Sequence, residues 1–101
     1  MATSIPHEQV HARLMEDPEY ARRWQETELA DAVATVLIAY RAQHGLTQTA
    51  LARQLGIGQP AVARLEAGEH APSIPTLARL ARVLGVEFHL HVTRDGLQLT
   101  A

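Results

Sequence analysis

The side chains best suited to recognition chemistry lie on one short predicted helix, residues 58–67. At about 100° per residue, its exposed face carries Gln59 and Arg64 among small residues, while Val62 and Leu65 lie on the opposite face. An arginine can donate two hydrogen bonds to guanine and a glutamine can bond adenine, so this face suits a DNA major groove about 12 Å wide. The alternative interpretation is that Arg64 is an ordinary solvated arginine.

The glutamate near the end of this helix raises a second question. Glu66 falls on the buried side beside Val62 and Leu65. An unpaired carboxylate there would cost several kcal/mol, so the position predicts a buried ion pair and not a catalytic acid.

Other chemistry has little support in this sequence. It contains no cysteine, two serines and no glycine-rich phosphate loop, so we expect no enzyme and no cofactor. Two histidine pairs have spacings that suit a metal: His7 and His11 are four apart, and His89 and His91 share a strand face. Neither pair has a third ligand nearby in the sequence. We therefore expect solvent-facing histidines and no metal site.

The hydrophobic periodicity predicts a mainly α fold with five or six helices, followed by a short β-strand or hairpin. Thr47, Gly58 and Ser73 are expected N-caps, and a Gly-Ile-Gly break separates two of the helices. The polar stretch 25–28 predicts a kink or break, and Asp95-Gly96 a two-residue hairpin turn. The tail is expected either to pack on the helices or to pair with a second chain. The helices are predicted over residues 5–17, 18–44, 47–55, 58–67 and 73–84.

Charge is divided unevenly along the chain, whose net charge is −2. Residues 1–31 hold three arginines against seven acidic residues, a balance of −4, and residues 32–85 hold five arginines against two glutamates, a balance of +3. This division suits a basic segment that binds a polyanion and an acidic segment with another partner. The alternative is that solvated helix faces simply differ in charge. Without a signal-peptide pattern or a membrane span, a cytoplasmic protein is expected.

The stretch "LTQTALARQLGIGQPAVARLEAGEHAPSIPTLARLARVLGV" resembles the helix-turn-helix of the lambdoid-repressor or XRE family. The resemblance implies a lambda-repressor-like domain over residues 32–86 that binds double-stranded DNA. It also implies that Gln48 clamps a phosphate, that early residues of the 58–67 helix read bases, and that Arg41 pairs with Glu66. The DNA contacts expected on this basis are Thr47, Gln48, Gly58, Gln59, Pro60, Ala61, Ala63, Arg64 and Ser73.

Three positions depart from the family pattern. Gly58 stands where the family usually has serine or threonine, so a side-chain cap is absent. Ala61 and Ala63 replace frequent hydroxyl residues. Base readout should therefore depend mainly on Gln59 and Arg64.

The flanking segments make the whole chain similar to HigA-type antitoxins, the partners of RelE-like ribonuclease toxins. Residues 1–31 correspond to an acidic helical arm and residues 87–101 to a β-tail. The resemblance implies a prokaryotic or phage homodimer that represses its own operon at a palindromic operator and neutralises a basic toxin. We expect dimer contacts at Phe88, Leu90 and Val92, and toxin contacts at Glu16, Asp17, Tyr20, Trp24 and Glu28.

Two other functions share every feature of the central domain. A stand-alone XRE-type regulator would have no toxin partner, and a protein-interaction module on the same fold would not need Arg64 or Gln48. For the acidic arm itself, the alternative is an extension that only stabilises the fold, and for Tyr20 and Trp24 it is a hydrophobic satellite of the core.

Overall fold

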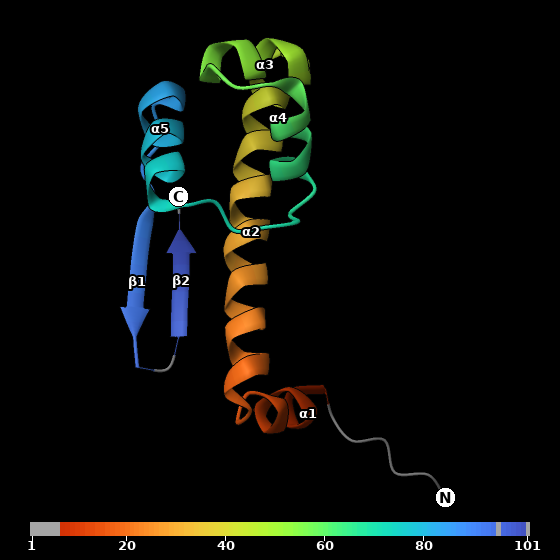
Figure 1. Cartoon of the computed structure of the whole chain (residues 1–101), viewed down its shortest axis with the longest axis vertical. Coiled ribbons are helices and arrows are strands. Elements are labelled where there is room, and N and C mark those ends of the chain that lie inside the picture. Colours follow the sequence, from red (N-terminus) through yellow and green to blue (C-terminus); the bar gives the residue numbers. More distant parts are fainter. Residues whose placement is uncertain (1–6, 95, 101) are drawn as a thin grey trace, which may run out of the picture.

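The computed structural model describes residues 7–94 and 96–100. Within these residues the chain forms five helices and one antiparallel hairpin, which confirms the predicted mainly α fold (Figure 1). No helix in the described part of the chain is both long enough and apolar enough to cross a membrane. The elements in chain order are α1 (His7–Leu14), α2 (Pro18–His44), α3 (Gln48–Leu55), α4 (Gln59–Glu66), α5 (Ile74–Leu84), β1 (His89–Thr93) and β2 (Gly96–Thr100).

Helix α2 is a single helix of 27 residues, so the break predicted at residues 25–28 is wrong. The backbone N–H of Glu19 donates to the Asp17 cap (2.9 Å), and the helix ends at Gly45, whose φ is 62°. The polar stretch contains no glycine or proline, and the preceding turn carries an ion pair between Arg23 and Glu19 (2.7 Å). Such pairs four residues apart stabilise a helix that is polar on every side.

The hydrophobic core is built between the C-terminal half of α2 and the three short helices. Its five largest fully buried side chains, one or two from each of these helices, are Val33, Leu37, Leu51, Val62 and Leu80. The N-terminal half of α2 extends beyond this core, and α1 crosses its end (Figure 1). The core therefore lies around the C-terminal half of α2, while the acidic arm projects from it.

The tail packs on the helices, which settles one of the two expectations for it. Strand β2 contacts α2, and Leu99 and Phe88 pack against the core. Thr93 pairs with Gly96, so Gly96 begins β2 and is not part of the turn, as the Asp95-Gly96 prediction had it; Asp95 lies outside the described residues. Strand β1 lies on the outer side of the hairpin (Figure 1), and all five of its residues are exposed.

The loop after α4 approaches α2 closely at Gly68, which has a φ of +66°. A Cβ there would lie 2.8 Å from Asp31 Oδ1, whereas a Cβ at Gly45, with a φ of +62°, would meet nothing within 4 Å. Both glycines occupy a conformation that disfavours a side chain. Only at Gly68 would the added Cβ also force a neighbouring side chain, that of Asp31, to move.

We expect Gly68→Ala to lower the free energy of unfolding by more than Gly45→Ala does. The strained backbone costs each variant about 1 kcal/mol, or roughly 4–8 °C in Tm for a domain of this size. Thermal melts followed by circular dichroism would measure the difference. Adding Asp31→Ala to Gly68→Ala should bring its Tm to that of Gly45→Ala, and an unchanged deficit would contradict the contact with Asp31.

Candidate nucleic-acid interface

The Gly-Ile-Gly break forms the turn between α3 and α4, as its residues predict. Helix α3 begins at Thr47, whose Oγ1 accepts from the backbone N–H of Ala50 (3.0 Å), and it ends at Gly56 with a φ of 70°. The backbone N–H of Ile57 then donates to the carbonyl of Ala52 (3.0 Å), which closes the helix end. Gly58 is the N-cap of α4, and its lack of a side chain leaves this cap without a side-chain hydrogen bond.

Helix α4 presents the face that the sequence predicted. Val62 is completely buried, and Leu65 is half-buried against the core. The side chains of Gln59, Pro60 and Arg64 are exposed, while Ala61 and Ala63 are half-buried. The outer surface of α4 is therefore low in relief except at Gln59 and Arg64, as a helix that enters a major groove requires.

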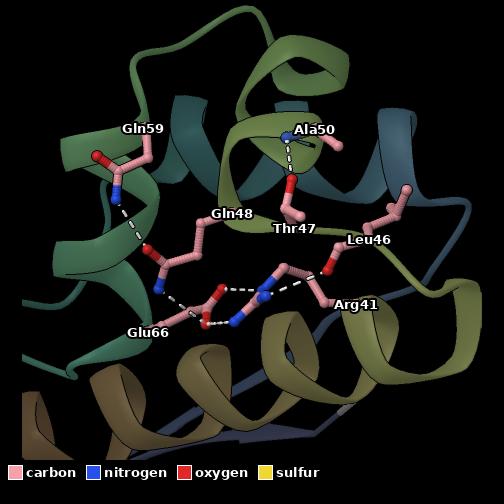
Figure 2. A network of polar contacts seen from close by, with 7 residues as sticks. All are labelled: Arg41, Leu46, Thr47, Gln48, Ala50, Gln59 and Glu66. Atoms are coloured by element: carbon pink, nitrogen blue, oxygen red, sulfur yellow. Dashed lines mark hydrogen bonds and ion pairs between the residues drawn. The ribbon is translucent and has the colours of Figure 1, made fainter.

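The N-termini of α3 and α4 are joined by their first side chains. Gln59 Nε2 donates to Gln48 Oε1 (2.8 Å), and Gln48 Nε2 donates to Glu66 Oε1 (3.4 Å) (Figure 2). Gln48 is therefore held from both ends of its amide. A side chain fixed in this way loses little conformational freedom when it meets a ligand.

Arg41 and Glu66 form the ion pair implied by the family resemblance. Arg41 Nε donates to Glu66 Oε2 (2.7 Å), Arg41 Nη2 donates to Glu66 Oε1 (2.8 Å), and Arg41 Nη1 donates to the carbonyl of Leu46 (3.1 Å) (Figure 2). The Glu66 side chain is 6% exposed and that of Arg41 is 25% exposed. This geometry ties α2 to the end of α4 by two parallel charge-assisted bonds.

The pair shifts both titrations in the direction expected of an ion pair. The hydrogen bonds from Arg41 hold the pKa of Glu66 below its ordinary value of 4.5, with a smaller contribution from Gln48. The same bonds raise the pKa of Arg41. Because the folded pKa of Glu66 is lower than the unfolded one, the pair stabilises the fold above about pH 4.5, and this contribution disappears as the pH falls through the folded pKa.

The expected consequence is an acid-labile fold. Between about pH 6 and about pH 3, the Tm of the native chain should fall more steeply than that of Glu66→Gln, which has no charge to lose at that position. Circular dichroism melts across this range would compare the two slopes. Parallel slopes would show that other carboxylates dominate acid unfolding.

The sequence did not predict the hydrogen bond by which Gln48, on the surface of α3, joins the ion pair of Arg41 and Glu66. Gln48 was expected only as a phosphate clamp, yet its amide also bonds Glu66, eighteen residues away. No local signal predicts this contact, because it depends on how α3 and α4 pack. One chain of hydrogen bonds therefore runs from Arg41 through Glu66 and Gln48 to Gln59 (Figure 2).

The remaining residues expected at DNA lie on a second part of the surface. Ser73 caps α5, where its Oγ accepts from the backbone N–H of Thr76 (3.3 Å) and donates to Thr76 Oγ1 (3.0 Å). Arg64 and Thr76 both line a mainly apolar hollow of about 270 Å³ together with Ile57 and Leu65. The N-terminal part of α5 thus lies near Arg64.

Of the residues expected at a toxin, all but Glu28 lie where α1 meets α2, and Glu28 lies further along α2. Tyr20 is half-buried, with its hydroxyl 3.5 Å from His11 Nδ1, and the Trp24 ring lies 4.4 Å from the His11 ring. Trp24 nevertheless remains 37% exposed. Glu16, Asp17 and Glu28 are exposed. The two aromatic residues therefore hold α1 against α2 and still leave part of the indole accessible.

Metal binding gains no site among the described residues of a single chain. Among residues 7–94 and 96–100, no three histidine, aspartate or glutamate side chains gather where a metal ion could be held. His89 has Glu87 as a neighbour, with 3.3 Å between His89 Nε2 and Glu87 Oε2.

Known proteins are similar to this chain in sequence. A family model described as helix-turn-helix matches residues 37–90. An uncharacterized HTH-type transcriptional regulator of Methanocaldococcus jannaschii is 38% identical over 48 residues, which are 48% of this chain and 73% of the relative. A second such regulator, from Haemophilus influenzae, is 38% identical over 61 residues, 60% of this chain and 62% of the relative.

One relative is similar over a longer stretch. Antitoxin HigA1 of Mycobacterium tuberculosis is 32% identical over 74 residues, which are 73% of this chain but only 50% of that protein. The present chain therefore spans about half the length of this relative. The helix-turn-helix match extends over more than half of the chain and includes α3 and α4. The chain belongs to the helix-turn-helix family and is a non-enzymatic, DNA-binding transcriptional regulator.

Proposed function

We propose that this chain is the antitoxin of a type II toxin-antitoxin module, which represses its own operon and neutralises a basic, RelE-like ribonuclease. The observation that carries the proposal is the similarity to Antitoxin HigA1. It extends over 74 residues, which is longer than the helix-turn-helix segment 37–90 and so includes flanking sequence. The match to the Haemophilus influenzae regulator, over 61 residues, also exceeds that segment, but the match to Antitoxin HigA1 is the longer of the two.

The DNA half of the proposal rests on the α3–α4 surface. Gln48, held by Glu66 and Gln59, would contact a phosphate, and Arg64 with the free part of Gln59 would read bases. One such helix reads only a few base pairs. A homodimer that sets two of them about 34 Å apart on one DNA face would read a palindromic operator.

The toxin half rests on the arm formed by α1 and the N-terminal half of α2. Its exposed carboxylates complement a basic protein, and charge of opposite sign speeds and orients association. Apolar side chains stand beside them: Val10 is 39% exposed, Leu14 42% and Trp24 37%. A partly exposed indole with a polar rim is typical of an interface anchor.

Co-expression with the neighbouring reading frame tests this function. If that frame encodes a short basic ribonuclease-like protein, its expression alone should arrest growth, and co-expression of this chain should restore it. Trp24→Ala should weaken the complex by at least tenfold, since an interface anchor is worth 2 kcal/mol or more. Arg64→Ala should leave toxin binding intact, because α4 lies apart from the arm.

The outcomes separate the antitoxin from its main alternative. A neighbouring protein that is not toxic, or toxicity that this chain does not relieve, would reject the antitoxin function. The second candidate is a stand-alone transcriptional regulator, which the 38% identity to HTH-type regulators favours. That protein would repress its promoter in a reporter strain without any partner.

A further inference from the structure

Strand β1 has one edge available for a further strand. In the described part of the chain the sheet has two strands, and β1 pairs with β2 alone. Because Thr93 and Gly96 close a two-residue turn, alternation directs the backbone groups of Leu90 and Val92 to the outer edge. Leu90 is 38% exposed and Val92 is 71% exposed. An exposed edge with apolar residues is a template for pairing with another strand.

The residues of β1 can pair with the same residues of a second copy of the chain. Antiparallel pairing about a two-fold axis through Leu90 sets Leu90 opposite the partner's Leu90, and Val92 opposite the partner's Phe88. This register uses the outward backbone groups of all three residues. It also places their side chains on one face, continuous with Leu99, which pairs with Leu90 in the hairpin. A second copy of this chain is therefore the occupant that the edge fits best.

The same register gathers histidines on the other face. His89 falls opposite the partner's His91, at a non-hydrogen-bonded pair, where Cα atoms are only about 4.5 Å apart. Imidazole nitrogens bind Zn²⁺ at about 2.0–2.1 Å, so two facing imidazoles can share one ion. Glu87, 3.3 Å from His89, supplies a carboxylate at the same place. Glu87 and His89 of one copy would supply two ligands, and the partner's His91 would supply the third.

We infer that two copies of this chain pair through β1 and together bind Zn²⁺ at two equivalent sites, each formed by Glu87 and His89 of one copy and the partner's His91. Two imidazoles and one carboxylate form a ligand set that suits Zn²⁺. The inference rests on the proposed homodimer and adds its register and its metal. Zn²⁺ bound only by the dimer must stabilise the dimer.

Sedimentation velocity of the untagged full chain, in EDTA and in excess Zn²⁺, tests the metal. At a free Zn²⁺ concentration about ten times the dissociation constant of each site, linkage at two sites should tighten the dimer by about 100-fold. His89→Ala/His91→Ala should still dimerise in EDTA but lose the response to Zn²⁺. His70→Ala, an exposed histidine in another loop, is the matched control and should respond like the native chain.

Leu90→Cys tests the register, since the chain has no other cysteine. A residue on the two-fold axis of a hydrogen-bonded pair has its Cα about 5.5 Å from its copy, within disulfide range. Under oxidising conditions the variant should form a covalent dimer.

Each outcome has a distinct meaning. A dimer in EDTA that Zn²⁺ does not tighten would overturn the metal site and leave the proposed dimer standing. An equal Zn²⁺ response in His89→Ala/His91→Ala would place the metal elsewhere and also overturn the site. A Leu90→Cys dimer that does not crosslink would overturn the register, and a monomer under every condition would overturn both the dimer and this inference.

Discussion

Arg64→Ala should weaken binding of the proposed homodimer to its proposed operator by roughly 100-fold, because a bidentate arginine contact to guanine is worth about 1–3 kcal/mol and a dimer would carry two. Arg64 is the exposed guanidinium on the outer face of α4, where neighbouring side chains are small. No other residue on that helix offers the same pair of donors. Its removal should therefore relax discrimination between operator and unrelated DNA.

Fluorescence anisotropy with DNA from the chain's own promoter, across a series of salt concentrations, would measure this loss. Arg22→Ala removes the same charge from the exposed N-terminal half of α2 and should change operator affinity little. If Arg64→Ala binds operator within threefold of the native chain, α4 does not read bases as proposed. If the native chain shows no salt-dependent DNA binding, its regulatory role would have to operate without the α4 surface.

Glu66→Ala should be the most destabilising change of a single polar residue in the described part of the chain. The substitution removes both acceptors of Arg41 and leaves that guanidinium half-enclosed with no counter-charge. It also removes the acceptor of Gln48. Loss of such charge-assisted bonds at a buried carboxylate costs about 3 kcal/mol, or roughly 10–20 °C in Tm.

Thermal and urea unfolding would measure this cost, with Glu69→Ala as the control. Glu69 is exposed in the loop after α4, so its removal should change stability by at most about 0.5 kcal/mol. Replacing both members of the pair, as in Arg41→Met/Glu66→Leu, should recover much of the loss, because no buried charge is then left unpaired. A Glu66→Ala variant that keeps its Tm and loses only DNA binding would show that the pair is not structural.

Arg64 and Glu66 differ in whether the sequence alone could predict their surroundings. Arg64 could be placed from the sequence alone, because the side on which it lies follows from its spacing to Val62 and Leu65 along one helix. The partner of Glu66 could not, because Arg41 lies 25 residues away and the two meet only when α2 and α4 pack. The resemblance to a family, and no local pattern, pointed to that partner.

The sequence by itself determined where most helices begin and end. Asp17, Thr47 and Ser73 cap the backbone within two or three residues of themselves, and Gly45, Gly56 and Gly85 adopt positive φ at the helix ends. These are local interactions, so neighbouring residues are enough to predict them. The alternation of the tail likewise predicted a hairpin, although Gly96, which was expected in its turn, begins β2.

Only the tertiary structure decided how these pieces act together. The polar stretch at residues 25–28 stays helical inside a 27-residue helix. Gln48 joins Gln59, on the outer surface of α4, to the part-buried ion pair, and β2 packs on α2 so that β1 is left outermost. Each of these features depends on contacts between residues far apart in the chain. The free energy that stabilises these features arises from packing between distant residues, which local propensity and spacing do not predict.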